Sequence, residues 1–95
     1  MRNDRILIST ILGAKIRYYR TLCGKTQKEL AALTNFSVST IQRIEEGQYD
    51  NIAPLATLID IANALNLDVA AFLTISEEEK KLALSKRKNR GRKYL

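Results

Sequence analysis

The amino-acid sequence predicts an all-α fold built from five helices. Apolar residues recur at helical spacing along most of the chain, strand-like alternation is nearly absent, and helix-capping residues stand before several of the apolar stretches. The 95 residues, 45% of them hydrophobic, are enough for one small core and leave no room for a second. We therefore expect one folded domain.

The first predicted helix ends near Gly24, which can terminate it by adopting the left-handed conformation. Its apolar stripe consists of Leu12, Ile16, Tyr19 and Cys23. Residues 1–11 either extend this helix or form an arm against a partner subunit, and the sequence leaves both possibilities open.

The second predicted helix is short and begins at a capping box formed by Thr26 and Glu29. Asn35 stands where this helix has to stop. After glycine, asparagine is the residue that most readily accepts a positive φ, so Asn35 is predicted to make the turn. Phe36 follows it and is expected to face the core.

The third predicted helix covers residues 37–46, with Ser37 as its cap. Ile41 and Ile44 lie three residues apart and therefore face the core together. The other side of the helix carries Val38, Ser39, Gln42, Arg43 and Glu46. Two short helices joined by a tight turn form a helix-turn-helix unit, whose second helix has the right width for the major groove of DNA.

Two more helices complete the predicted core. Pro54 fits the first turn of the fourth helix. The apolar surface of this helix is predicted to consist of Leu55, Leu58, Ile59, Ile61, Ala62 and Leu65. Asp68 can cap a short fifth helix over residues 69–75, with Phe72 and Leu73 turned inward.

Residues 76–95 form a charged extension of the domain. Ser76 and Glu79 make a second capping box, and acids in the first turn with bases in the last suit a helix dipole. The terminal stretch NRGRKYL is expected to be disordered. The predicted organisation is thus residues 1–11 as helix extension or arm, 12–75 as the folded domain, and 76–95 as charged helix and basic tail.

The positive charge of the chain is concentrated in this tail. The formal net charge is +6, and residues 80–95 hold eight of the 16 bases and none of the ten acids. The other 79 residues keep eight bases and ten acids, a net charge of −2. Nucleic-acid binding by the folded part must therefore rest on particular residues rather than on its overall charge.

The composition argues against an enzyme and against a metal site. The chain has no histidine and only one cysteine, Cys23, which removes the usual zinc ligands and the common nucleophile and base pairs. Gly24-Lys25-Thr26 does not belong to a phosphate-binding loop, because Tyr19 stands where that motif needs glycine. We expect no cofactor, no small-molecule ligand and no membrane span, and the lone cysteine suits the reducing cytoplasm.

The stretches GKTQKELAALTNFSVSTIQRIEEG and TLIDIANALNLDVAAFL resemble the phage repressor and Cro-like helix-turn-helix family of DNA-binding transcriptional regulators. The resemblance covers residues 12–73. Its markers are Arg20, Thr26-Gln27, Glu29-Leu30-Ala31, Ser37, Ile41, Ile44-Glu45, Gly47, Thr57-Leu58 and Ile61-Ala62. The chain departs from the family at Asn35 and Asn66, where glycine is usual, and at Leu33 and Val38, where polar residues are commoner.

The resemblance implies a DNA contact surface on the third helix. The residues facing bases would be Val38, Ser39, Arg43 and, at the edge, Gln42. Arg43 can bond guanine O6 and N7, whereas Val38 can only pack, most usefully on a thymine methyl group. The alternatives are that a neighbouring loop covers Val38 and that Arg43 is a solvated surface charge. Phosphate contacts would come from Gln27, Gln48, Tyr49 and Asn51.

The resemblance also implies a supporting pair, Arg20 and Glu45, that bridges the first helix to the end of the third and fixes the angle of the latter. Asn35 supports the same helix by making the turn in front of it. Losing one member of the pair would leave the other without its partner and tilt the reading helix.

The expected function is sequence-specific binding of double-stranded DNA by a transcriptional regulator, a repressor, acting as a homodimer. The operator would be an inverted repeat with half-sites roughly 34 Å apart. The dimer surface is expected around Leu67, Phe72 and Ile75, by analogy with the family. The competing interpretation is a protein-interaction module of the same fold, coactivator-like or antitoxin-like, whose basic tail gives only nonspecific nucleic-acid contact.

Overall fold

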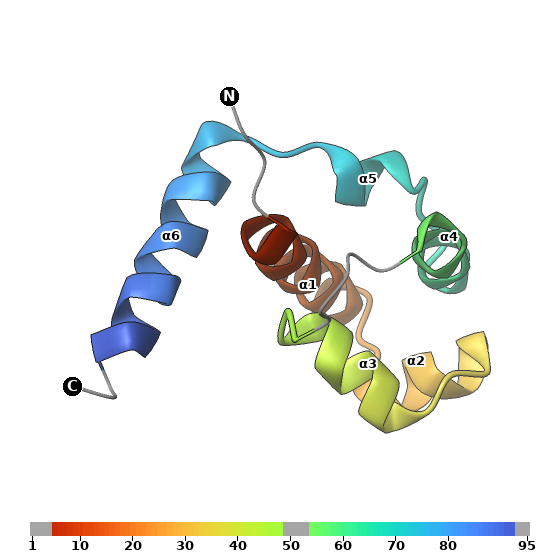
Figure 1. Ribbon diagram of the computed structural model, residues 1–95. Helices are drawn as coiled ribbons and strands as arrows, with labels where there is room; N and C mark the ends of the chain where they lie inside the picture. The colour runs from red at the N-terminus through yellow and green to blue at the C-terminus, as the bar shows by residue number, and fades with distance from the viewer. Residues whose placement is uncertain (1–4, 49–53, 93–95) are drawn as a thin grey trace.

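The structure is a computed structural model that describes residues 5–48 and 54–92, with backbone alone for residues 86–92. Six helices occur in this part of the chain (Figure 1). They are α1 (Arg5–Leu22), α2 (Gln27–Thr34), α3 (Val38–Glu45), α4 (Leu55–Ala64), α5 (Ala70–Leu73) and α6 (Glu77–Arg92). Since the described residues include no strand, the predicted all-α fold is confirmed.

Helix α1 is the element on which the others assemble. It contacts α3, α5 and α6, while α2 contacts α3 and α4. The largest fully buried side chains are Ile16, Leu30, Ile41, Leu58, Ile61 and Phe72, and they come from all five helices of the core. Each such side chain contributes about 1.5 to 3 kcal/mol by leaving water. This burial packs α3 against both α1 and α2.

The predicted local signals around α2 and α3 are present. The Thr26 hydroxyl accepts a hydrogen bond from the Glu29 amide at 3.0 Å, and the Glu29 carboxylate accepts one from the Thr26 amide at 2.9 Å. Asn35 has φ +61° and forms the left-handed turn. Ser37 caps α3 by accepting from the Thr40 amide at 3.0 Å. The turn before α3 is therefore held by hydrogen bonds that the local sequence supplies.

Helix α1 begins at Arg5, so residues 5–11 are part of that helix. Ser9 and Thr10 are buried although they are polar, and the Thr10 hydroxyl donates to the Ile6 carbonyl at 2.8 Å. Of the two possibilities left open by the sequence, helix extension is the one observed for these residues. None of the helices within the described ranges is long and apolar enough to cross a membrane.

Three of the side chains predicted to face the core are exposed. On α4, Leu55 is 56% and Ile59 38% exposed, because α4 packs through a narrower stripe that includes Leu58 and Ile61. Leu73 of α5 is 49% exposed. Helix α5 spans only Ala70–Leu73, shorter than predicted, and a single turn can direct just one large side chain inward.

The prediction that Phe72 belongs to a dimer surface together with Leu67 and Ile75 is wrong. Phe72 has no exposed area, because its ring packs in the core beside that of Tyr19, with the ring centres 5.9 Å apart. Leu67 and Ile75 are half-buried. Cys23, predicted on the apolar stripe of the first helix, is also exposed.

Helix α6 extends further toward the C-terminus than predicted. Residues 89–92 were expected to be disordered, yet the helix continues to Arg92. Lysine and arginine are good helix formers, and the capping box at Ser76 and Glu79, with both bonds at 3.1 Å, fixes the first turn. Residues 93–95 lie outside the described part of the chain.

The attachment of α6 to α1 is predicted to weaken in acid. Burial raises the pKa of Glu79, but hydrogen bonds from Lys15 and from Ser76 outweigh this and hold the pKa below its ordinary value of 4.5. A carboxyl of this kind stabilises the folded state fully above pH 4.5, and the contribution is lost as the pH falls through the folded-state pKa. Lys15→Gln should therefore lower the hydrogen-exchange protection of α6 amides more at about pH 6 than at about pH 3.

Glu78→Gln is the matched control for this experiment, since Glu78 is exposed in the same turn of α6. It should leave the pH dependence intact. An equal effect of Lys15→Gln at both pH values would contradict the assigned role of the ion pair.

Candidate nucleic-acid interface

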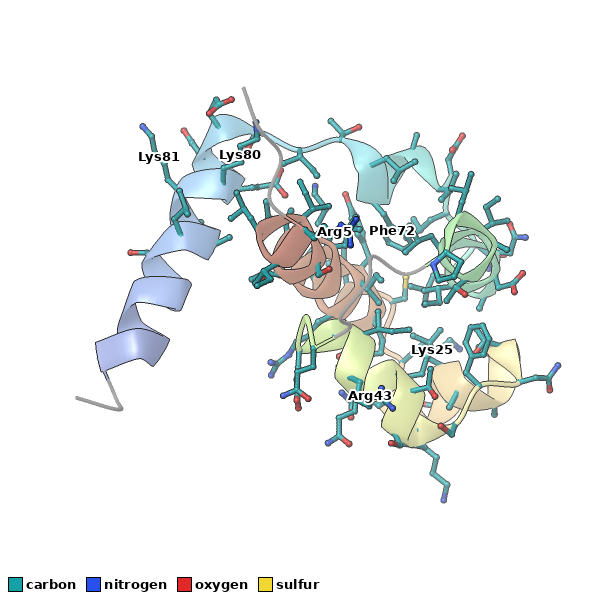
Figure 2. All side chains as sticks on the ribbon, viewed as in Figure 1. Arg5, Lys25, Arg43, Phe72, Lys80 and Lys81 are labelled. Atoms are coloured by element: carbon teal, nitrogen blue, oxygen red, sulfur yellow. The ribbon has the colours of Figure 1, made fainter. Side chains whose placement is uncertain are left out.

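Helix α3 presents a row of exposed side chains on the side away from the core. Ile41 and Ile44 are 0% and 5% exposed and hold the helix to α1 and α2. The exposed residues are Val38, Ser39, Gln42 and Arg43, the four for which base contacts were predicted. Figure 2 shows Arg43 on the outer side of α3. The structure thus brings the four together on one accessible surface, while their contact with DNA stays a prediction.

The orientation of α3 is fixed by a buried ionic network centred on Glu45. The Glu45 side chain is 2% exposed and the Arg20 side chain 12%. Arg20 donates twice to this carboxylate, from Nε to Oε2 at 2.6 Å and from Nη2 to Oε1 at 3.0 Å. These bonds raise the pKa of Arg20 above its ordinary value, although burial alone would lower it. The predicted pair is therefore present as a two-pronged contact between α1 and α3.

Gln27 joins the same network, which the sequence analysis did not foresee. Its amide Nε2 donates to Glu45 Oε1 at 3.1 Å, and its side chain is half-buried. Arg20 Nη1 also donates to the Lys25 carbonyl at 2.7 Å. Glu45 thereby links α1, the start of α2 and the end of α3, and these bonds fix the positions of the three helices relative to one another. The predicted phosphate contact of Gln27 stays untested beside this observed role.

Gly13 is a structural determinant of the interface that sequence reasoning missed. A Cβ atom at this position would lie 2.7 Å from the Glu45 carbonyl oxygen and closer still to that of Ile44. Helix α1 can approach the last turn of α3 only because residue 13 has no side chain. The available signal was a glycine inside an otherwise apolar helical stretch, which often marks close backbone contact.

A groove bordered by α1, α2 and α3 runs beside the exposed row. Its lining residues are Arg17, Arg20, Thr26, Gln27, Lys28, Val38, Gln42 and Glu46. Arg17 and Lys28 are exposed cations that the sequence analysis did not select. Arg17 stands one turn before Arg20, so helical spacing from Arg20 was the signal that could have found it. Lys28 is the next residue after Gln27 at the start of α2, and only this adjacency in the sequence pointed to it.

Of the other three residues predicted to contact phosphates, only Gln48 lies in the described part of the chain. Gln48 lies three residues after the last residue of α3 and is exposed, and its backbone amide donates to the Arg43 carbonyl at 2.9 Å. Tyr49 and Asn51 lie outside the described residues. Among residues 5–48 and 54–85, no group of three or more metal-ligating side chains is found.

Comparison with known proteins identifies the fold. The helix-turn-helix family model matches residues 16–72, more than half of the chain, and includes α2, α3 and the Arg20–Glu45 pair. No curated protein sequence matches.

Two solved structures share more than a quarter of their aligned residues with this chain. The clp gene regulator ClgR from Corynebacterium glutamicum is 27% identical, with a TM-score of 0.66, over 78% of this chain and 88% of ClgR. The restriction-modification controller protein C.AhdI from Aeromonas hydrophila is 26% identical, with a TM-score of 0.63, over 67% and 94%. A third structure, the hypothetical transcription factor NHTF from Neisseria, shares the fold at 22% identity and a TM-score of 0.68, over 86% and 92%.

The family and these regulators indicate a protein that acts on transcription rather than an enzyme. The turn at Asn35, the capped helix α3 and the buried network around Glu45 all lie within the matched residues 16–72. The chain belongs to the Cro/C1-type helix-turn-helix family of DNA-binding transcriptional regulators.

Proposed function

We propose that this protein is a sequence-specific repressor that reads the major groove of double-stranded DNA with α3. The observation that carries the proposal is the exposed row of Val38, Ser39, Gln42 and Arg43 on a helix whose opposite side is buried and locked. A helix held in this way can enter the groove without rearranging, so its side chains meet base edges in a fixed register.

The four residues support a small recognition code. Arg43 can donate two hydrogen bonds to guanine O6 and N7, and Gln42 can pair with adenine. Val38, which is 41% exposed, offers an apolar surface suited to a thymine methyl group. Ser39 can donate or accept and so discriminates least. With one charged reader, each copy of α3 specifies only a few base pairs.

Such a limited code favours binding as a homodimer. A dimer doubles the contacts, and its two-fold axis calls for an inverted-repeat operator with half-sites roughly 34 Å apart. A dimer seated on such a site would repress by excluding other proteins from the same DNA. Leu73, which is 49% exposed on α5, replaces the buried Phe72 as the apolar side chain available near the surface first expected to pair.

Phosphate contacts would set the register of α3 in the groove. We assign them to Gln27, as the resemblance implies, and to Gln48, Tyr49 and Asn51, whose side chains carry neutral donors. We add Arg17 and Lys28 because these two cations line the groove next to Val38 and Gln42. Contacts of this kind position the protein and carry no sequence information.

In vitro selection of duplexes bound by the full chain tests the proposal, and an enriched inverted repeat is the expected result. Arg43→Ala should relax the preference at one base pair per half-site, at a cost of about 1 to 3 kcal/mol in binding that site. Competition between the selected duplex and single-base variants measures both effects.

Arg5→Ala is the matched control, because Arg5 is an exposed arginine at the first residue of α1, outside the groove (Figure 2). It should leave the preferred sequence unchanged. If Arg43→Ala also leaves the preference unchanged, or if no repeat is enriched, the interaction-module function replaces the DNA-reading one.

A further inference from the structure

Helix α6 is an addition to the family domain, since it follows the last residue of the 16–72 match. It is held to α1 along its first half. Lys15 Nζ and Glu79 Oε2 form an ion pair at 2.9 Å, and Ala83, one turn further on, is 5% exposed against α1. Leu82 and Leu84 on either side of it are 66% and 43% exposed, so the contact strip is narrow.

This attachment gives the second half of α6 a defined direction. The helix continues without a break to Arg92. In Figure 1 it continues from the segment after α5 and runs to the lower left of the view, and its C-terminal end lies in the lower half of the picture, as α2 and α3 do, but to the left of them. Residues 89–92, which were expected to be disordered, are instead part of this helix.

The excess of positive charge lies in the second half of α6 and not in the domain that bears α3. Residues 1–79 carry ten acids and eight bases, so the domain that bears α3 has no net attraction for a polyanion. Nonspecific affinity for DNA arises almost entirely from the neutralisation of phosphates by lysine and arginine. Residues 86–92 contain five of these cations and no acid, and the helix places them beyond the attached half of α6.

We propose that residues 86–92 of α6 form a directed arm that binds the phosphates of duplex DNA next to the site contacted by α3. The inference rests on the proposed DNA-binding function and deepens it: α3 supplies sequence preference, and α6 supplies most of the sequence-independent attraction. The partner chemistry is the phosphate backbone of a double helix.

The test compares two double variants with the same loss of charge. Arg87→Gln with Arg90→Gln removes two cations of the arm, whereas Arg5→Gln with Lys81→Gln removes two exposed cations outside it. The probe is a mixed-sequence DNA duplex of about 30 base pairs, titrated by fluorescence anisotropy between about 50 and 200 mM salt. The slope of log K against log salt should fall by about 0.9 for each phosphate that the variant no longer neutralises.

The expected result is a slope lowered by about 1.8 in the Arg87 and Arg90 variant, with binding at least tenfold weaker, and a slope close to wild type in the control variant. Equal changes in both variants would mean that only net charge matters and would overturn the inference. An unchanged slope in the Arg87 and Arg90 variant would overturn it as well.

The outcome is separable from that of the proposed function. If the arm variant keeps the wild-type slope while Arg43→Ala relaxes the base preference, the arm is overturned and the reading function stands. If the slope falls as expected but selection enriches no sequence, the arm is supported and the reading function fails.

Discussion

Glu45→Gln is expected to lower the free energy of unfolding by about 3 kcal/mol, because it leaves Arg20 buried without its counter-ion. The Arg20 side chain is only 12% exposed and makes both of its carboxylate contacts through Glu45. The glutamine amide group would also turn a donor toward the guanidinium. Since small domains are stable by about 5 to 15 kcal/mol, urea unfolding followed by circular dichroism will resolve the change.

Glu46→Gln is the control for this variant. The same chemical change is made one residue further on, where the side chain is exposed, and it should alter stability by no more than about 0.5 kcal/mol. Glu45→Gln should also weaken binding to the selected duplex, because Glu45 sets the angle between α3 and α1. If Glu45→Gln loses as little stability as Glu46→Gln and leaves DNA affinity unchanged, the network around Glu45 does not fix the orientation of α3.

The parts of the structure that were predicted correctly depend on local chemistry. The capping box at Thr26 and Glu29 and the turn at Asn35 follow from bonds and backbone angles within a few residues. Such features are legible in the sequence because both partners lie close together in it. The Arg20–Glu45 pair was found differently, through resemblance to a family, since 25 residues separate its members.

The missed features depend on where helices meet. Leu55 and Ile59 belong to an apolar surface by sequence, yet the neighbours of α4 cover only part of it. Gln27 looked like a phosphate ligand because nothing in its surroundings reveals that Glu45 lies 3.1 Å away. Arg17 lies one helical turn from Arg20, but only the groove between three helices shows that it stands beside Val38 and Gln42. These roles depend on contacts between helices, and the spacing of apolar residues in the sequence does not show which helices meet.

Gly13→Ala is expected to lower the stability of the protein, although helix propensity alone predicts that it should raise it. Inside a helix, replacing glycine with alanine normally stabilises by about 1 kcal/mol. Here the new methyl group would meet the carbonyl oxygens of Ile44 and Glu45, both backbone atoms of α3 that cannot rotate away. We expect a net destabilisation of about 2 kcal/mol, within the range seen for overpacked cores.

The same substitution should affect DNA binding more than its cost in stability explains. Relief of the clash requires α1 and the end of α3 to move apart, which pulls Glu45 from Arg20 and shifts the exposed row of α3. Ala14→Gly serves as the control on the adjacent, exposed position of α1, where about 1 kcal/mol should be lost by propensity alone and affinity for the selected duplex should be kept. If Gly13→Ala instead raises the urea midpoint, α1 and α3 are not in the close contact that fixes the reading helix.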